Sequence, residues 1–153
     1  MSPSTIRQIQ LSDKQAWLEL WNQYYSLHQR TIASEVTETT FSRFIDPGTR
    51  IYCAVATILT EAEQHKVIGF VTFYPHLTTS SIDEKVYMQD LFVSPDAQRH
   101  GIGRQLVEHV YEKAREMKAS DVHWTAANGN SRAQALYAKV GQKTDQEVWK
   151  KTL

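Results

Sequence analysis

The sequence is most informative at first in what it lacks. Its only cysteine is Cys53, so an internal disulfide is excluded. Seventeen basic residues balance seventeen acidic ones, so no overall field attracts nucleic acid or an anionic membrane. No apolar run approaches the roughly 20 residues that span a membrane, and residues 1–10 lack the apolar centre of a signal peptide. We therefore expect a soluble cytoplasmic protein, or a nuclear one in a eukaryote, without nucleic-acid or membrane partners.

Metal and thiol chemistry are not indicated either. The six histidines show no H-E-x-x-H spacing and no short-range pairing with cysteine, so we expect no metal site. Cys53 lies in an apolar, strand-like run, which is typical of a small buried hydrophobe rather than a nucleophile. A hydrophobic fraction of 41% and a charged fraction of 22% are ordinary for a globular protein. The 153 residues predict one domain, residues 1–153.

Hydrophobic spacing predicts an α/β (α+β) chain of alternating helices and strands. Strands are expected over residues 5–9, 50–59, 67–74, 85–93, 121–126 and 145–152. Helices are expected over residues 13–28, from 34 or 37 to 45, over 101–118 and over 130–140, with Gly141 as a left-handed cap. The second and third strands should form a hairpin. The fourth and fifth flank a helix, so they should be parallel neighbours joined by a right-handed crossover.

A turn that contains two glycines lies between the fourth strand and the long helix after it. Its residues are Gln98, Arg99, His100, Gly101, Ile102, Gly103 and Arg104. The first amides of a helix have no acceptor within the helix, and glycines let an anion approach them closely. A dinucleotide fold would carry a third glycine where Leu106 stands, and a P-loop would need Gly-Lys-Ser/Thr, which is absent. The turn therefore predicts a pyrophosphate site, with its arginines and histidine as additional donors.

A second motif, N-x-x-A-x-x-L-Y-x-K-x-G, follows the fifth predicted strand and starts at Asn130. Together with Q-x-x-G-x-G from Gln98, it resembles the GNAT superfamily of acetyl-CoA-dependent N-acetyltransferases over residues 88–141. The resemblance implies a mixed, mainly antiparallel sheet flanked by helices, with its parallel strands splayed around acetyl-CoA. Residues 43–47, 89–93 and 132–137 further resemble a fungal and bacterial branch that acts on histone tails, polyamines or amino acids.

The resemblance also implies a set of residues that bind the coenzyme. The amides of Gln98, Arg99, His100, Gly101, Ile102, Gly103, Arg104 and Gln105 would hold its pyrophosphate. Its pantetheine arm would pair with Leu91, Phe92 and Val93 and lie beside Asn130 and Ala133, with Tyr137 near the thioester sulfur. A bulge near Asp90 would hold the two parallel strands apart.

The implied reaction needs a base and an acid. A primary amine has a pKa near 10.4, so presenting it uncharged at pH 7 costs roughly 4.6 kcal/mol. Related enzymes often carry glutamate where this chain has Gln89, which accepts no proton, so Asp90 is the nearest carboxylate, with a water chain to a distant group as the alternative. Tyr137 is the expected acid for the departing thiolate, and amides near Leu91 or Phe92 the expected oxyanion donors.

The acceptor is expected to be a small amine or a lysine-containing peptide. Trp17, Trp21, Tyr24 and Tyr25 form a helical aromatic stripe. We assign Trp17 to the core, and Trp21 and Tyr24 to the rim of the acceptor site together with Asp90. A homodimer is expected through the last predicted strand. The alternatives are a non-catalytic acyl-CoA sensor, which Gln89 favours, and a protein-interaction module that uses the edge of that strand.

Overall fold

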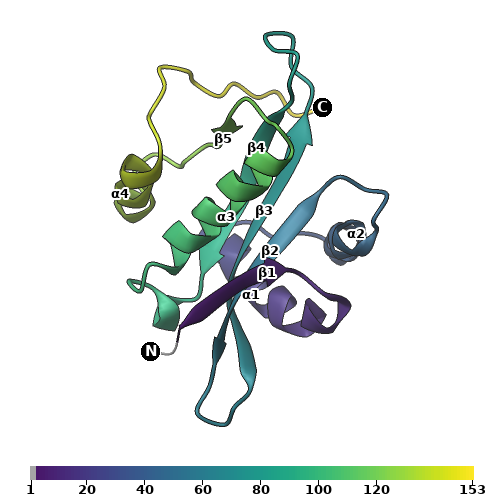
Figure 1. Ribbon diagram of the computed structural model, residues 1–153, viewed down its shortest axis with the longest axis vertical. Helices are drawn as coiled ribbons and strands as arrows, with labels where there is room; N and C mark the ends of the chain where they lie inside the picture. The colour runs from purple at the N-terminus through teal and green to yellow at the C-terminus, as the bar shows by residue number, and fades with distance from the viewer. Residues whose placement is uncertain (1–2) are drawn as a thin grey trace.

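The computed structural model describes residues 3–153 and shows one sheet with helices on both faces (Figure 1). The elements in chain order are β1 (Ser4–Gln8), η1 (Leu11–Asp13), α1 (Lys14–Leu27), α2 (Ser34–Ile45), β2 (Tyr52–Leu59), β3 (His65–His76), β4 (Lys85–Val93), η2 (Pro95–Ala97), α3 (Ile102–Glu116), β5 (Val122–His123) and α4 (Ser131–Val140).

The strands lie side by side in the order β1-β2-β3-β4-β5. The first four are antiparallel, and β5 is parallel to β4. The hairpin of β2 and β3 and the parallel pair on either side of α3 are therefore confirmed. The parallel pairing is brief, because only Val86 and Tyr87 of β4 have partners in β5.

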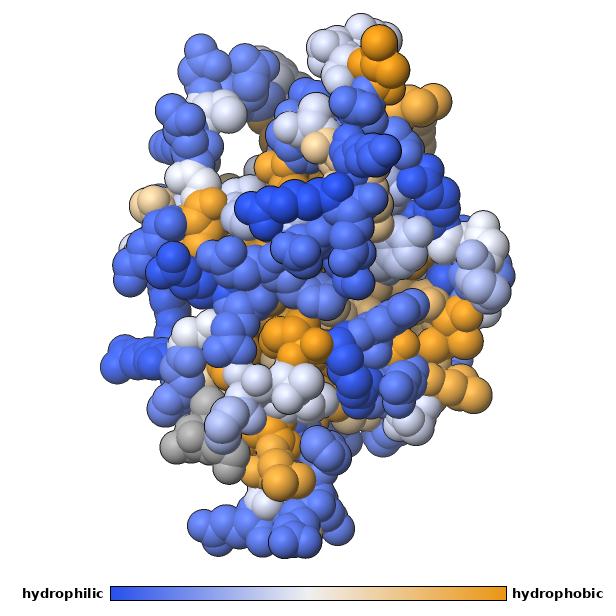
Figure 2. Space-filling view, in the orientation of Figure 1, coloured by the Kyte–Doolittle hydropathy of each residue, from blue (hydrophilic) through white to orange (hydrophobic). Residues whose placement is uncertain are grey.

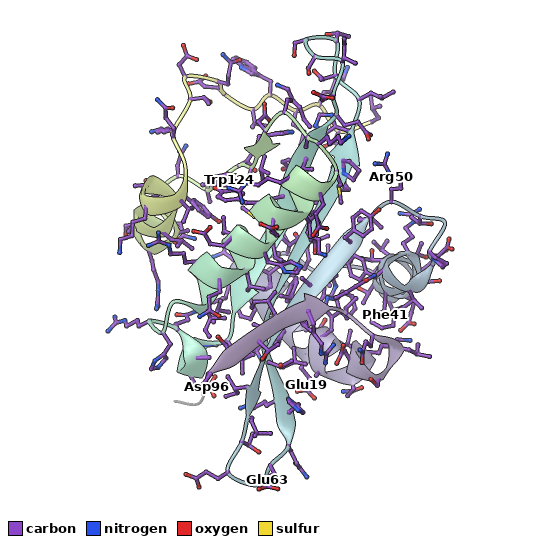
Figure 3. All side chains as sticks on the ribbon, viewed as in Figure 1. Glu19, Phe41, Arg50, Glu63, Asp96 and Trp124 are labelled. Carbon is purple, nitrogen blue, oxygen red and sulfur yellow. The ribbon has the colours of Figure 1, made fainter. Side chains whose placement is uncertain are left out.

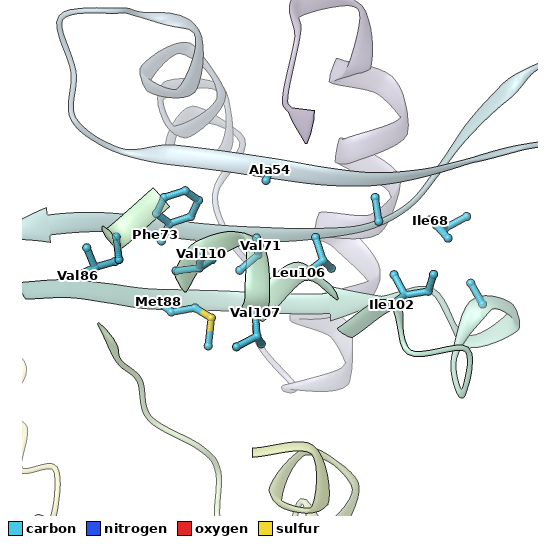
Figure 4. Close-up of a cluster of buried hydrophobic side chains, with 13 residues drawn as sticks. Ala54, Ile68, Val71, Phe73, Val86, Met88, Ile102, Leu106, Val107 and Val110 are labelled. Carbon is cyan, nitrogen blue, oxygen red and sulfur yellow. The ribbon is translucent and has the colours of Figure 1, made fainter. Parts of the chain in front are cut away.

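Two apolar clusters fix the helices to the sheet. In the first, Leu106, Val107 and Val110 of α3 pack on one face of the sheet (Figure 4). In the second, the aromatic side chains of α1 and α2 pack on the other face, and Trp17 is completely buried, as predicted. On the surface that Figure 2 shows, hydrophilic side chains predominate and apolar ones form small separate groups.

One extra residue in β4 changes which face its side chains occupy. Thr72 of β3 pairs with Asp90 and the next residue pairs with Met88, so Gln89 has no partner. Before this bulge Met88 packs with α3, and after it Phe92 packs with α1. Strict alternation would have placed both on the same face. The predicted bulge near Asp90 is thus confirmed, and it directs the Asp90 carboxylate toward α1.

The strand expected over residues 145–152 is wrong. Residues 141–153 form neither helix nor strand, and all of them are exposed. A β-prone pattern forms a strand only where a neighbouring edge supplies backbone partners, and within the described residues this segment meets none. β5 is likewise only two residues long, shorter than the predicted 121–126. In contrast, β3 continues through Pro75. β2 begins with Tyr52 opposite Phe73, so Pro75 lies beyond it and pairs only with Val86 of β4, where a proline is tolerated.

Gly141 ends α4, but not with the predicted left-handed conformation. Its φ of −154° and ψ of −166° are extended values that any residue adopts. Glycine is required for a different reason: a Cβ there would lie 2.5 Å from the Trp124 indole. The glycine therefore permits close contact between the end of α4 and the segment after β5.

Replacing Gly141 tests this contact. We expect Gly141→Ala to lower the free energy of unfolding by about 1–3 kcal/mol, the usual effect of overpacking, because the indole must move. Gly48→Ala is the matched control, since its Cβ would meet only Asp46 at 3.4 Å. Thermal unfolding of both variants measures the difference. Equal midpoints would contradict the packing role of Gly141.

Candidate functional site

The turn after β4 brings free backbone amides to one end of the sheet. α3 begins at Ile102, and its first helical hydrogen bond runs from the Gln105 amide to the Gly101 carbonyl at 3.0 Å. The amides of residues 101–104 precede that bond and have no acceptor within the helix. The Gln98 side chain donates to the Val93 carbonyl at 2.9 Å, which fixes the turn to the end of β4. The amides and the positive end of the helix dipole together suit an anion.

The two glycines of the turn have different structural roles. Gly101 has a φ of 77°, which favours glycine, and nothing lies within 4 Å of the position of a Cβ there. A Cβ on Gly103 would instead lie 3.1 Å from the Leu136 side chain of α4. The sequence interpretation gave both glycines a role toward the anion. The structure assigns Gly103 to helix packing and leaves open space only at Gly101.

Three basic side chains of this region are exposed: Arg99, His100 and Arg104. Arg104 lies 3.5 Å from Glu108 in an exposed ion pair, an interaction too weak to hold it in place. Arg99 has a φ of 70°, so the chain turns sharply just before the helix. All three are therefore available to a negatively charged ligand at the start of α3.

A pocket of about 90 Å³ opens where β4 and β5 separate. Figure 3 shows Trp124 between α4 and α3, and its ring lies 5.5 Å from that of Tyr137. The structure thus brings residues from four separate segments together. The lining residues are Tyr24, His28, Met88, Gln89, Asp90, Leu91, Trp124, Thr125, Ala126, Ala127, Asn130, Ala133 and Tyr137.

Fewer than half of the residues predicted for the site meet in this pocket, and the turn at residues 98–105 is not part of its lining. Tyr24, Asp90, Asn130, Ala133 and Tyr137 line it, and the Asn130 side chain also caps α4 by accepting from the Ala133 amide at 3.2 Å. Phe92, by contrast, is buried among the aromatics of α1.

Trp21 also lies outside the pocket, although we had predicted it at the acceptor rim. It is 4% exposed, and its indole N–H donates to the Thr37 hydroxyl at 3.0 Å. The pocket also contains His28, which the sequence interpretation did not assign, and Trp124, which agrees with the expectation that only one of His123 and Trp124 faces the cleft. The sequence contained one signal for His28: it lies one helical turn after Tyr24, so both residues face the same side of α1.

Asp90 is the carboxylate at the base of the pocket and is 5% exposed. Burial raises its pKa above the usual value, and the hydroxyls of Thr72, Tyr24 and Tyr25 act in the opposite direction. The Tyr25 hydroxyl donates to it at 3.4 Å. Thr72 is the sheet partner of Asp90, and its buried hydroxyl is close enough to affect the carboxylate but is not aligned for a hydrogen bond with any group in residues 3–153. The result is a carboxylate that is more basic than a solvated one.

The phenols around Asp90 are weaker acids than free tyrosine. Burial, followed by the nearby Asp90 charge, raises the pKa of Tyr25 to about 12 and raises that of Tyr24 as well. Burial alone raises the pKa of Tyr137. These hydroxyls therefore keep their protons at neutral pH and can act as donors.

Residues 3–153 contain neither a metal-binding cluster nor a membrane-spanning helix. No group of three histidine, cysteine or carboxylate side chains is placed to hold a metal ion. None of the described helices is long and apolar enough to cross a membrane.

Comparisons with known proteins agree with this arrangement. A sequence model described as "Acetyltransferase (GNAT) family" matches residues 14–142. The D-amino-acid N-acetyltransferase of Saccharomyces cerevisiae is 39% identical over 95% of this chain and 89% of its own length. The thialysine N-epsilon-acetyltransferase of Bos taurus is 29% identical over 64% of this chain and 60% of its own length.

Solved structures show the same fold at low sequence identity. A ribosomal-protein-alanine N-acetyltransferase from Brucella melitensis superimposes with a TM-score of 0.81 at 16% identity, over 99% of this chain and 100% of its own. AAC(6')-Iy in complex with a CoA-based bisubstrate analogue gives a TM-score of 0.82 at 14% identity, over 99% of each chain.

The burial of Asp90 predicts a pH-dependent effect on stability. Because its pKa is raised on folding, the folded state holds the proton more tightly, and stability is lost as the pH rises from about 4 through the raised pKa. Asp90→Asn should match the wild type near pH 3 and unfold at a higher temperature at pH 7. The expected gain is about 1.4 kcal/mol for each unit of the shift.

Thermal unfolding from pH 3 to pH 8 measures this difference. Asp145→Asn, in the exposed segment after α4, is the control for general charge effects. A wild type that is more stable than Asp90→Asn at pH 7 would show that the carboxylate stabilises the fold as an anion.

Proposed function

Because this chain belongs to the GNAT family of acetyltransferases, we propose that it transfers the acetyl group of acetyl-CoA directly to a primary amine. One observation carries the proposal. A basic carboxylate, Asp90, and a protonated phenol, Tyr137, line the same pocket between the separating strands β4 and β5. An amine acceptor needs the carboxylate as a base, and a thiolate leaving group needs the phenol as a proton donor.

The coenzyme would lie across the end of the sheet. The amides of residues 101–104 would hold its diphosphate, with Arg99, His100 and Arg104 as additional donors. Beyond Tyr87, β4 has no partner in β5 within the described chain, so its backbone near Leu91 is free to pair with the pantetheine amides. When bound, acetyl-CoA supplies the acetyl group as a thioester.

The acceptor would enter from the side of α1. An ammonium group beside Asp90 would be attracted to the carboxylate, and the raised pKa of that carboxylate favours removal of a proton. Removal is the costly step, since an ordinary amine holds its proton by roughly 4.6 kcal/mol at pH 7. Burial makes Asp90 more basic, and the hydroxyls of Tyr24 and Tyr25 offset part of that effect.

Tyr137 would act on the departing group. Its hydroxyl is protonated at neutral pH, and its ring is held against Trp124. A thiolate with a pKa of about 8.5 is stabilised as it forms by a phenol with a pKa of about 10 or more.

A non-catalytic acyl-CoA sensor is the second candidate, and Gln89 favours it. This residue occupies the bulge beside Asp90 and accepts no proton. Thiol release from acetyl-CoA in the presence of an amine panel separates the two functions. The relatives that act on D-amino acids and on thialysine define the first amines to include.

Tyr137→Phe tests the role of the phenol. We expect turnover to fall about 100-fold with little change in the Kd for acetyl-CoA, because only the proton donor is lost. Tyr52→Phe is the matched control, since Tyr52 packs against Phe73 rather than in the pocket. Steady-state kinetics and isothermal titration measure the two quantities. An unchanged turnover would remove Tyr137 from the mechanism.

We also propose that the protein forms a homodimer through its last residues. Val148, Trp149 and Leu153 are exposed, at 76%, 87% and 111% of their reference areas, on a segment with a strand-like pattern and no strand partner. Within the described residues, β5 pairs with another strand on one side only. The exposed segment of one copy and the free edge of another are complementary.

Light scattering tests the dimer. The full chain should give about twice the 17.6 kDa of one copy, and a chain that lacks residues 147–153 should give the mass of a monomer. Trp149→Lys should also shift the measured mass toward that of a monomer. A full chain with the mass of a single copy would contradict the proposal.

A further inference from the structure

The end of α1 places an arginine against Tyr25, whose hydroxyl contacts the pocket carboxylate Asp90. The Gln29 amide donates to the Ser26 carbonyl at 3.0 Å, and the Arg30 amide donates to the Tyr25 carbonyl at 2.9 Å. Gln29 has a left-handed φ of 54°. This pair of bonds is a Schellman motif, which reverses the chain at the end of the helix. The reversal brings Arg30 back over its own helix.

The Arg30 guanidinium consequently lies over the Tyr25 ring, 5.4 Å from its centre. The hydroxyl of the same ring donates to Asp90 at 3.4 Å. A single phenol therefore contacts a fixed cation on its face and the pocket carboxylate at its tip. Arg30 forms no ion pair with any acidic side chain in residues 3–153, so its charge is free for a ligand.

A second nitrogen group at the C-terminal end of α1 belongs to His28. The His28 ring is 4.7 Å from that of Tyr24, and His28 lines the pocket. Asp90 is the only acidic side chain in the lining. The buried carboxylate thus has an imidazole in the same lining and a guanidinium linked to it through the Tyr25 ring.

This charge pattern is complementary to a zwitterion. In an α-amino acid one carbon separates the amine from the carboxylate, and with hydrogen bonds of about 2.9 Å at each end the molecule bridges groups roughly 8 to 9 Å apart. A polyamine would bring only positive charge to Arg30. A lysine side chain within a peptide carries no carboxylate near its amine.

We propose that Arg30 binds the α-carboxylate of a free amino acid whose amine lies at Asp90, which makes α-amino acids the acceptor class. This inference rests on the proposed acetyl transfer. Arginine suits the task because its planar fork donates two parallel hydrogen bonds to one carboxylate. Arg30 is a binding residue in this account, so its loss affects KM more than kcat.

The test compares acceptors that differ only in the carboxylate. Acetyl transfer is measured with D-alanine, L-alanine, their two amides and putrescine. We expect the wild type to prefer at least one alanine enantiomer over its amide. Arg30→Gln should raise the KM for that enantiomer about 10-fold to 100-fold and leave the amide unchanged. The KM of Arg30→Lys for the same enantiomer should lie between those of the wild type and Arg30→Gln. Arg115→Gln, which replaces an exposed arginine of α3, should leave the KM unchanged.

The outcomes separate this inference from the proposed function. If the amides and putrescine react as well as both alanines, or if Arg30→Gln slows alanine and alaninamide equally, the carboxylate site is wrong while acetyl transfer stands. Isothermal titration of the preferred alanine into the protein with coenzyme A gives a readout that needs no turnover. Binding that depends on Arg30 in a protein without transfer activity would support the carboxylate site and contradict the transfer.

Discussion

The extra residue at Gln89 is the constraint on which the site depends. Without it, Asp90 and Phe92 would continue the α3 face that Met88 occupies. With it, Asp90 faces Thr72, Tyr24 and Tyr25 on the α1 side, where burial makes it a stronger base. The same irregularity lies just beyond the two residues of β4 that pair with β5. One local feature thus orients the carboxylate and marks where the pocket opens.

A buried carboxylate destabilises the fold when it is charged, and the rest of the molecule offsets that cost. Two apolar clusters clamp the sheet, one beneath α3 and the other beneath α1 and α2. Rigid packing on both faces holds Asp90 among hydroxyl groups rather than letting it reach water. The opposite wall is looser, since α4 has no buried residue and depends on contacts such as that of Gly141 with Trp124.

The sequence predicted what is decided locally. The helices and the first five strands follow from hydrophobic spacing, and the turn before α3 follows from its glycines. The resemblance to the GNAT superfamily implied the bulge and the grouping of Tyr137, Asp90 and Asn130. Positions decided by tertiary contacts were missed. Gly103 and Gly141 are glycines because Leu136 and Trp124 approach them, and neither neighbour is adjacent in sequence. Trp21 joined the core because Thr37 of α2 satisfies its indole, and residues 145–152 found no edge in their own chain.

The most direct test of the account is a crystal structure of the protein with coenzyme A. We expect the diphosphate within hydrogen-bond distance of the amides of residues 101–104, and the pantetheine in the gap between β4 and β5 beside Leu91. A larger hollow of about 470 Å³ lies between α1 and α2, lined by Lys14 and Phe41 among others. Coenzyme A bound there, with the start of α3 free of ligand, would contradict the account.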